Sequence, residues 1–131
     1  MMKKLFCILL AAALCLCLAA CGGTGTGADY TVAIVQQMDH SSLDEIREAV
    51  KAELEALAAE KGITIAYKEF NGQNDATTLN QIGTQVVSEG YDAIIPIATL
   101  AAQCMVNAAD GTGIPVVYAA ISDPAEAGVE G

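Results

Sequence analysis

The side chains that could carry out catalysis are few and lie far apart in the sequence. The single histidine, His40, has Asp39 and Asp44 nearby, but no further histidine stands at a metal-ligand spacing from it. No serine–histidine–aspartate, cysteine–histidine or paired-carboxylate arrangement stands out either. The sequence therefore predicts no enzyme, no metal site and no cofactor.

Uncharged polar groups are instead concentrated in four short segments, each directly after a stretch that the sequence predicts to be a strand. The segments are residues 36–40, 71–75, 98–103 and 121–124. In open parallel sheets, ligands bind outside the carboxyl ends of the strands, near the point where the strand order reverses. These four segments are therefore the predicted place for a ligand.

The elements that would position these segments alternate along the chain from residue 29 onward. The predicted strands are residues 30–35, 63–70, 93–98 and 115–119. The first is β-branched and nearly continuous in its apolar character, as in a parallel strand covered on both faces. The turn-forming segment 111–113 precedes the last.

Three helical patterns separate the predicted strands. The first helix has a capping box at Ser42 and Glu45 and a left-handed cap at Gly62. Its apolar stripe, at spacings of three and four, is Leu43, Ile46, Val50, Leu54 and Leu57. Asp75 caps the second helix, which ends at Gly90 and buries Leu79, Ile82 and Val86. The third, Ala-rich helix covers residues 99–109.

Strands separated by helices of this length cannot form hairpins, so the sheet is predicted to be parallel with right-handed crossovers. The predicted fold is α/β, a three-layer parallel sheet of order 2-1-3-4 with helices on both faces. Flavodoxin-like and response-receiver domains share this order. Receivers, however, need an acidic cluster after the first strand, where this chain has Gln36 and Gln37, and an aspartate after the third, where it has Ala98 and Thr99.

The start of the chain has the features of an export signal. Lys3 and Lys4 precede an apolar run at residues 5–18, which is shorter than the roughly 20 residues that span a bilayer. The following residues, Leu18-Ala19-Ala20-Cys21, resemble the lipobox of bacterial lipoproteins. The resemblance implies a signal peptide at residues 1–20, lipid attachment to Cys21 and a flexible Gly/Thr tether through residue 29. The alternative is an ordinary secretory signal cut after Ala20.

Cysteine usage and charge narrow the possible partners. Cys7, Cys15 and Cys17 lie within the signal and Cys104 stands alone, so the sequence predicts no disulfide framework. All sixteen acidic residues but only four of the six basic ones follow Cys21, which gives that part a net charge of −12. Such a surface repels phosphate backbones, so nucleic acid is not an expected partner.

Several pieces of the sequence together point to a family. They are residues 33–40 with 43–48, 71–75, 97–103, and 114–118 with 121–124. In this order and at these spacings they resemble the ABC-transporter substrate-binding family that includes tryptophan and tyrosine uptake lipoproteins. The resemblance covers residues 30–131, and it departs from the family at Leu100, where a proline is usual.

The resemblance implies a two-lobed protein that closes on a small ligand such as an aromatic or other amino acid. Residues 30–131 would be the N-terminal lobe, of the periplasmic-binding-protein-like class I type, held by its lipid on the extracytoplasmic face of the cell membrane. The partners would be the ABC permease and ATPase subunits. Without the second lobe the chain is expected to be a fragment, or to pair with a second polypeptide, and to bind poorly alone.

The resemblance also assigns roles to particular residues. Gln37 and His40 would touch the ligand, while Thr99 and the amides that open its helix would accept a carboxylate. Asp123 would take an α-amino group, and Gln103 would line the cleft. Each has a structural alternative: a surface position for His40, an N-cap for Thr99, a turn at Asp123 and a solvated position for Gln103. A surface structural lipoprotein without a transport role is the alternative function.

Overall fold

Three parallel strands form the central sheet. They are β1 (Tyr30–Gln36), β2 (Ile65–Asn71) and β3 (Ala93–Ile97), and they lie in the order β2-β1-β3. The computed structural model describes residues 27–129. The predicted signal peptide, Cys21 and most of the predicted tether lie outside these residues.

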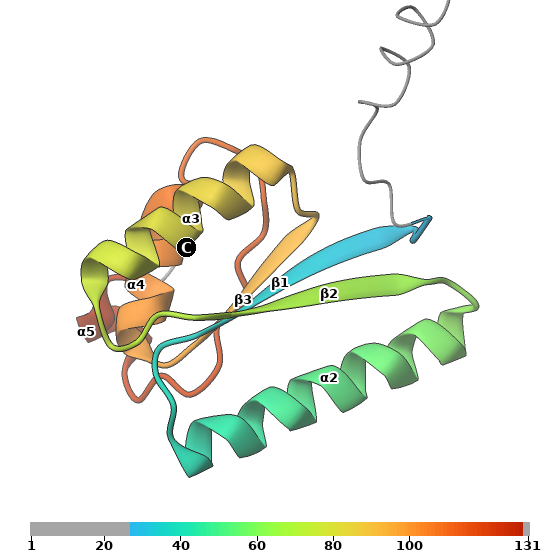
Figure 1. Ribbon diagram of the computed structural model, residues 1–131, viewed down its shortest axis with the longest axis horizontal. Coiled ribbons are helices and arrows are strands. Elements are labelled where there is room, and N and C mark those ends of the chain that lie inside the picture. The colour runs from blue at the N-terminus through green and yellow to red at the C-terminus, as the bar shows by residue number, and fades with distance from the viewer. Residues whose placement is uncertain (1–26, 130–131) are drawn as a thin grey trace, which may run out of the picture.

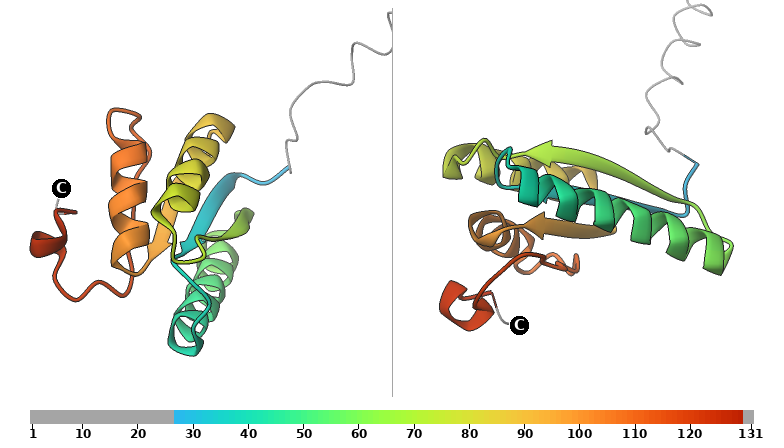
Figure 2. Two further views of the ribbon diagram at one scale, coloured as in Figure 1. Left: turned by 60° about the vertical axis from the view of Figure 1, so that its left-hand side comes forward. Right: turned by 90° about the horizontal axis from the view of Figure 1, so that it is seen from below.

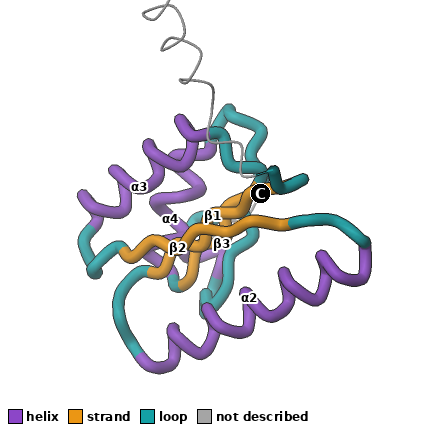
Figure 3. The backbone as a smooth tube through the Cα atoms, turned by 45° about the vertical axis from the view of Figure 1, so that its right-hand side comes forward, coloured by secondary structure: helices purple, strands orange, loops and turns teal. Residues whose placement is uncertain are grey.

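Helices cover both faces of the sheet, as predicted (Figure 1). The long helix α2 (Ser41–Lys61) lies on one face, and α3 (Ala76–Glu89) and α4 (Thr99–Ala109) lie on the other. Figure 3 shows the three layers from another side. None of the helices formed by residues 27–129 is long and apolar enough to cross a membrane.

Side chains of β1 alternate between the two faces and join a separate core on each. Val32 and Ile34 face α2, which contributes Leu43, Ile46, Val50 and Leu54 to that core. Ala33 and Val35 face α3 and α4, where the buried partners are Leu79, Ile82, Val86, Ala101, Cys104, Met105 and Ala109. The predicted helix faces are therefore confirmed, except that Leu57 of α2 is 36% exposed and lies outside the core.

The predicted fourth strand does not form as a regular strand. Residues 115–119 lie parallel to β3 but pair with it only through two isolated bridges, Ile94 with Val116 and Ile97 with Ala119. The reason is Pro96, which lacks the N–H that would donate to the carbonyl of Val117. The carbonyl of Pro96 still accepts from the Ala119 amide at 3.0 Å, so the segment keeps the fourth position in the order.

The helix ends test the predicted caps. The left-handed cap at Gly62, the end of α3 at Gly90 and the cap at Asp75 are all as predicted, and Gly90 is left-handed as well. The predicted cap at Ser42 is wrong. The N-cap of α2 is His40, because its Nδ1 accepts the Ser42 amide at 3.2 Å. An imidazole nitrogen reaches the first-turn amides as a carboxylate or hydroxyl does.

A short helix that the sequence did not lead us to predict follows residues 115–119. α5 (Pro124–Ala127) begins after Asp123 and ends at Gly128, which has a φ of 69°. It lies beside α4, as Figure 2 shows. An aspartate cap, a proline in the first turn and a glycine after the last are the usual signals of a helix, so the sequence did contain the evidence for it.

Candidate functional site

The loops that follow the three strands meet at one edge of the sheet. The amide of Gly72 donates to the Gln36 carbonyl at 2.8 Å, and the amide of Asn74 donates to the Gln37 carbonyl at the same distance. On the other side of β1, the Gln37 amide donates to the Ile97 carbonyl at 3.1 Å. Backbone hydrogen bonds thus tie the predicted ligand segments after β1, β2 and β3 to each other.

The Gln37 side chain joins the same three segments. Its Oε1 accepts the Leu100 amide at 2.9 Å, and its Nε2 donates to Asn74 Oδ1 at 2.9 Å. Leu100, at which the family resemblance leads one to expect a proline, therefore uses its N–H to bind a side chain from another strand. The amides at the start of α4 were predicted to bind a ligand carboxylate, and one of them already donates to the Gln37 oxygen.

Thr99 is the first residue of α4 and not its cap. The N-cap position is Ala98, which has a φ of 79° and no side-chain hydrogen bond to the helix. A φ in this region is uncommon for a residue with a Cβ and is strained. Thr99 itself is exposed, so its hydroxyl is free of the capping role and stands at the start of the helix.

The loop after β2 is held by polar contacts of its own. Asn71 Nδ2 donates to Asp39 Oδ1 at 2.5 Å, and Asn71 Oδ1 accepts the Gln73 amide at 2.8 Å. Gln73 and Asn74 both have positive φ values, 53° and 56°. A hydrogen bond from the Thr78 backbone amide, and a second from its hydroxyl, hold the pKa of Asp75 below its ordinary value, so this cap stays ionised further into the acidic range.

The loop after β1 is anchored from beneath by Gln36, whose side chain is buried. Its Nε2 donates to the Met38 carbonyl at 2.7 Å and to Asp44 Oδ1 at 2.9 Å, while its Oε1 accepts from Arg47 Nη1 at 3.0 Å. Arg47 also pairs with Glu69 of β2 at 3.1 Å. This network fixes the start of α2, and with it His40, to the end of the sheet.

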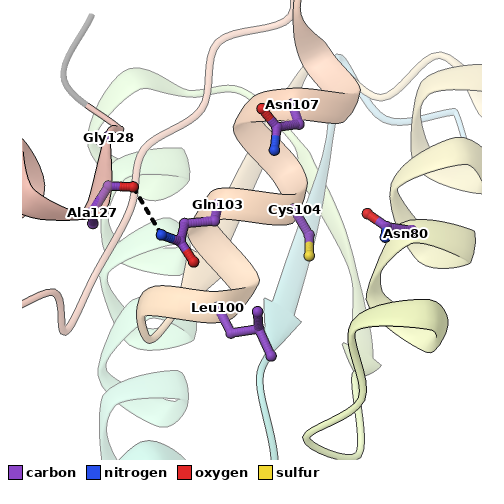
Figure 4. Close-up of a pocket in the computed structure, with 7 residues that line it drawn as sticks. All are labelled: Asn80, Leu100, Gln103, Cys104, Asn107, Ala127 and Gly128. Carbon is purple, nitrogen blue, oxygen red and sulfur yellow. Dashed lines mark hydrogen bonds between the residues drawn. The ribbon is translucent and has the colours of Figure 1, made fainter.

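A cavity of about 300 Å³ lies between α3, α4 and α5. Its lining includes one predicted site residue, Gln103, whose Nε2 donates to the Ala127 carbonyl at 2.9 Å (Figure 4). The other lining residues are Asn80, Leu100, Cys104, Asn107, Ala127 and Gly128. Gln103 and Asn107 are four residues apart and so share one face of α4, a spacing from which the sequence could have indicated this polar surface.

The remaining predicted residues have structural contacts in this form of the protein. His40 and Asp123 are exposed and cap α2 and α5, and Asp123 Oδ1 accepts the Glu126 amide at 3.0 Å. Gln37 binds the start of α4 at Leu100, the residue after Thr99, whereas Gln103 and Asp123 are connected through α5. Asn74, which holds the Gln37 side-chain amide, was not among the residues predicted to contact the ligand.

The chemistry of this edge is hydrogen bonding. Burial raises the pKa of the Cys104 thiol, so this residue is a neutral thiol at neutral pH and a poor nucleophile. In residues 27–129, no three histidine, cysteine or acidic side chains come together as a metal site requires. The groups offered at the strand ends are amides, a hydroxyl, an imidazole and helix N-terminal N–H groups, which suit a small polar ligand.

Comparison with known proteins identifies the family of this chain. Residues 31–130 match the family described as ABC transporter substrate binding protein. The chain belongs to this family. The family is one of substrate-binding proteins and is not an enzyme family.

Relatives of the ABC substrate-binding family agree in sequence and in structure. A tyrosine-binding protein of Clostridioides difficile is 35% identical over 98 residues, which are 75% of this chain and 28% of that protein. The chain thus spans less than a third of this relative's length.

Two solved structures share the fold. One is a ligand-free, open substrate binding protein with adhesive properties from Clostridium difficile, with a TM-score of 0.68 and 33% identity. The other is an ABC domain in complex with L-Trp from Streptococcus pneumoniae, with a TM-score of 0.67 and 30% identity. The matches cover 76% and 77% of this chain and 33% of each structure. The α/β architecture is therefore that of one lobe of a periplasmic-binding-protein-like substrate-binding protein.

Proposed function

We propose that this chain is the ligand-capturing N-terminal lobe of an extracytoplasmic solute-binding lipoprotein that serves an ABC importer. The observation that carries the proposal is the convergence of three strand-end loops and the α4 N-terminus at one sheet edge, in a chain of the substrate-binding family. The ligand is an amino acid, and an aromatic one is favoured because relatives are a tyrosine-binding protein and a protein in complex with L-Trp.

The geometry supports specific roles at this edge. The exposed Thr99 hydroxyl and the first-turn amides of α4 other than that of Leu100, which Gln37 occupies, would hold the carboxylate of the amino acid, since a helix N-terminus favours an anion. His40, Gln37 and Gln103 would line the ligand side of the lobe, and Asp123 would attract the α-amino group. The second lobe that encloses the ligand would come from further chain or from a second polypeptide.

Attachment and delivery complete the proposal. Residues 1–20 would be removed as a signal peptide, and lipid on Cys21 would hold the lobe at the extracytoplasmic face of the membrane. The permease and the ATPase of the importer would be its protein partners.

Calorimetric titration of a soluble form that begins after Cys21 tests the ligand class. L-Tyrosine and L-tryptophan are compared with tyramine, which lacks the carboxylate, and with N-acetyl-tyrosine, which lacks the cationic amine. The titration is repeated on the longest reading frame that contains the chain. Binding of the free amino acids with loss for both analogues supports the proposal, and no binding to either protein across a broad amino-acid panel would contradict it.

A second candidate is a surface lipoprotein without a transport role. It is favoured by one observation, that a structural relative is described as a substrate binding protein with adhesive properties. Adhesion of cells displaying the chain to a host-cell layer, undiminished by deletion of the importer, would support this role. Amino-acid uptake that depends on the chain would support transport.

A further inference from the structure

Gln37 uses all of its polar groups to hold two neighbouring loops. Its backbone N–H donates to the Ile97 carbonyl, and its backbone carbonyl accepts the Asn74 amide. Its side chain contacts the same two sides: Nε2 donates to Asn74 Oδ1 and Oε1 accepts the Leu100 amide, both at 2.9 Å. Four hydrogen bonds of one residue thus join the end of β1 to the loop after β2, to the end of β3 and to the start of α4.

The contact to Leu100 supplies what α4 lacks. The first amides of a helix have no acceptor within the helix, and a side chain at the N-cap normally satisfies one of them. Here the N-cap is Ala98, which offers no side-chain acceptor. The Gln37 oxygen takes its place from 63 residues away, in a part-buried hydrogen bond.

We propose that Gln37 is a positioning residue that caps α4 from β1 and locks its N-terminus against the loop after β2. It thereby sets the spacing between the groups that are proposed to bind the ligand. That part of the inference rests on the proposed function. Gln37 acts through Leu100 and Asn74. Its side-chain oxygen is committed to the Leu100 amide, so the role that it adds at this edge is to hold α4 in place.

Amide hydrogen exchange by NMR on the mature chain tests the cap without any ligand. In Gln37→Leu the Leu100 amide loses its acceptor, and its exchange is expected to accelerate at least about tenfold while core amides of β1 remain protected. Gln37→Glu keeps an acceptor for Leu100, and Asn74 can turn its amide to donate to the second carboxylate oxygen, so protection is retained. Gln85→Leu, which removes an exposed glutamine of α3, is the matched control.

The result that overturns the proposal is an unchanged exchange rate of Leu100 in Gln37→Leu. If that variant does not fold, Asn74→Gly removes only the side-chain contact, and glycine accepts the left-handed backbone at this position. The Gln37 amide is then free to rotate, and faster exchange at Leu100 is expected. An unchanged rate in that variant contradicts the lock between the two loops.

Titration of the same variants with L-tyrosine separates this inference from the proposed function. Gln37→Glu places a negative charge at the α4 N-terminus and is expected to weaken binding of the carboxylate while Leu100 stays protected. Absence of L-tyrosine binding in both the unmodified chain and the longest reading frame that contains it would count against the proposed function. The exchange rates would still decide whether Gln37 caps α4.

Discussion

At the scale of single residues, the buried amide of Gln36 shows how the polar edge is tied to the core. The residue is 1% exposed, and hydrogen bonds from both ends of its amide lead to α2. A buried polar atom without a partner costs more than its hydrogen bond contributes. The contact between Gln36 Oε1 and Arg47 is therefore a sensitive point of the fold.

Arg47→Met is expected to lower the free energy of unfolding by about 1–3 kcal/mol, because it leaves Gln36 Oε1 buried without a donor. Urea unfolding followed by circular dichroism measures the change. Lys51→Met, which removes ion pairs to the exposed carboxylates of Glu48 and Glu69, is the control with a smaller expected effect.

The double variant Gln36→Leu/Arg47→Met removes both partners of the hydrogen bond between Gln36 Oε1 and Arg47. It is expected to recover part of the loss, because the buried Oε1 is removed together with its donor. The recovery is incomplete, since the Met38 carbonyl and Asp44 lose the donor that Gln36 Nε2 supplied. Equal losses in Arg47→Met and Lys51→Met would show that the contact with Gln36 has no special weight.

At the scale of elements, α3 and α4 pack closely at a glycine. A Cβ added at Gly83 would lie 2.7 Å from the Cβ of Ala108 and 3.2 Å from the Cε of Met105. The absence of a side chain at this position therefore lets the two helices approach each other. This contact also fixes the wall of the cavity to which α3 and α4 contribute Asn80 and Gln103.

Gly83→Ala is expected to lower the free energy of unfolding by about 1–2 kcal/mol. Overpacking costs about 1–3 kcal/mol. The higher helix propensity of alanine offsets up to about 1 kcal/mol of it. Thermal or urea unfolding measures the difference. The double variant Gly83→Ala/Ala108→Gly should relieve the overlap and give a positive coupling energy in a double-mutant cycle. A stabilised Gly83→Ala would show that α4 can move away at no cost.

Elements whose signals are local could be predicted from the sequence. The helix ends at Gly62 and Gly90 and the cap at Asp75 depend on neighbouring residues only, and the structure confirms all three. The broken fourth strand depends on register as well. Pro96 was visible in the sequence, but that its missing N–H faces residues 115–119 follows only from the pairing of the two segments.

The candidate site could be predicted as a set of segments but not as a set of contacts. Placing 36–40, 71–75 and 98–103 at one edge needs only the parallel strand order. The contact between Gln37 and Leu100 joins residues 63 positions apart, and nothing in either local sequence specifies it. The imidazole cap at His40 was missed for a different reason, because serine is the commoner cap and stood two residues further on.

At the scale of the whole molecule, several of the carboxyl groups make the free energy of unfolding fall at low pH. Four carboxyl groups have pKa values held below their ordinary values by hydrogen-bond donors: Asp29, Glu48, Asp75 and Glu89. A carboxyl whose pKa is lower in the folded state binds its proton first in the unfolded state. Its contribution is therefore present above the unfolded pKa and lost as the pH falls through the folded pKa.

The urea midpoint is accordingly expected to stay nearly constant between neutral pH and about pH 5, and to fall as the pH drops below about 4. In Asp75→Asn, one of the four groups no longer titrates, so the fall should become shallower. A midpoint that did not change between about pH 5 and pH 3 would contradict the pKa differences.

The two isolated bridges on either side of Pro96 also affect how readily the protein aggregates at high concentration. Residues 115–119 form the outermost segment of the sheet, Val117 is 60% exposed, and no charged side chain occurs from residue 113 to residue 122. Charged side chains at a sheet edge are a common protection against edge-to-edge aggregation, and this segment has none. Concentrated solutions of the chain are thus expected to aggregate first through this edge. Val117→Lys would place a charge there and is expected to reduce the aggregation.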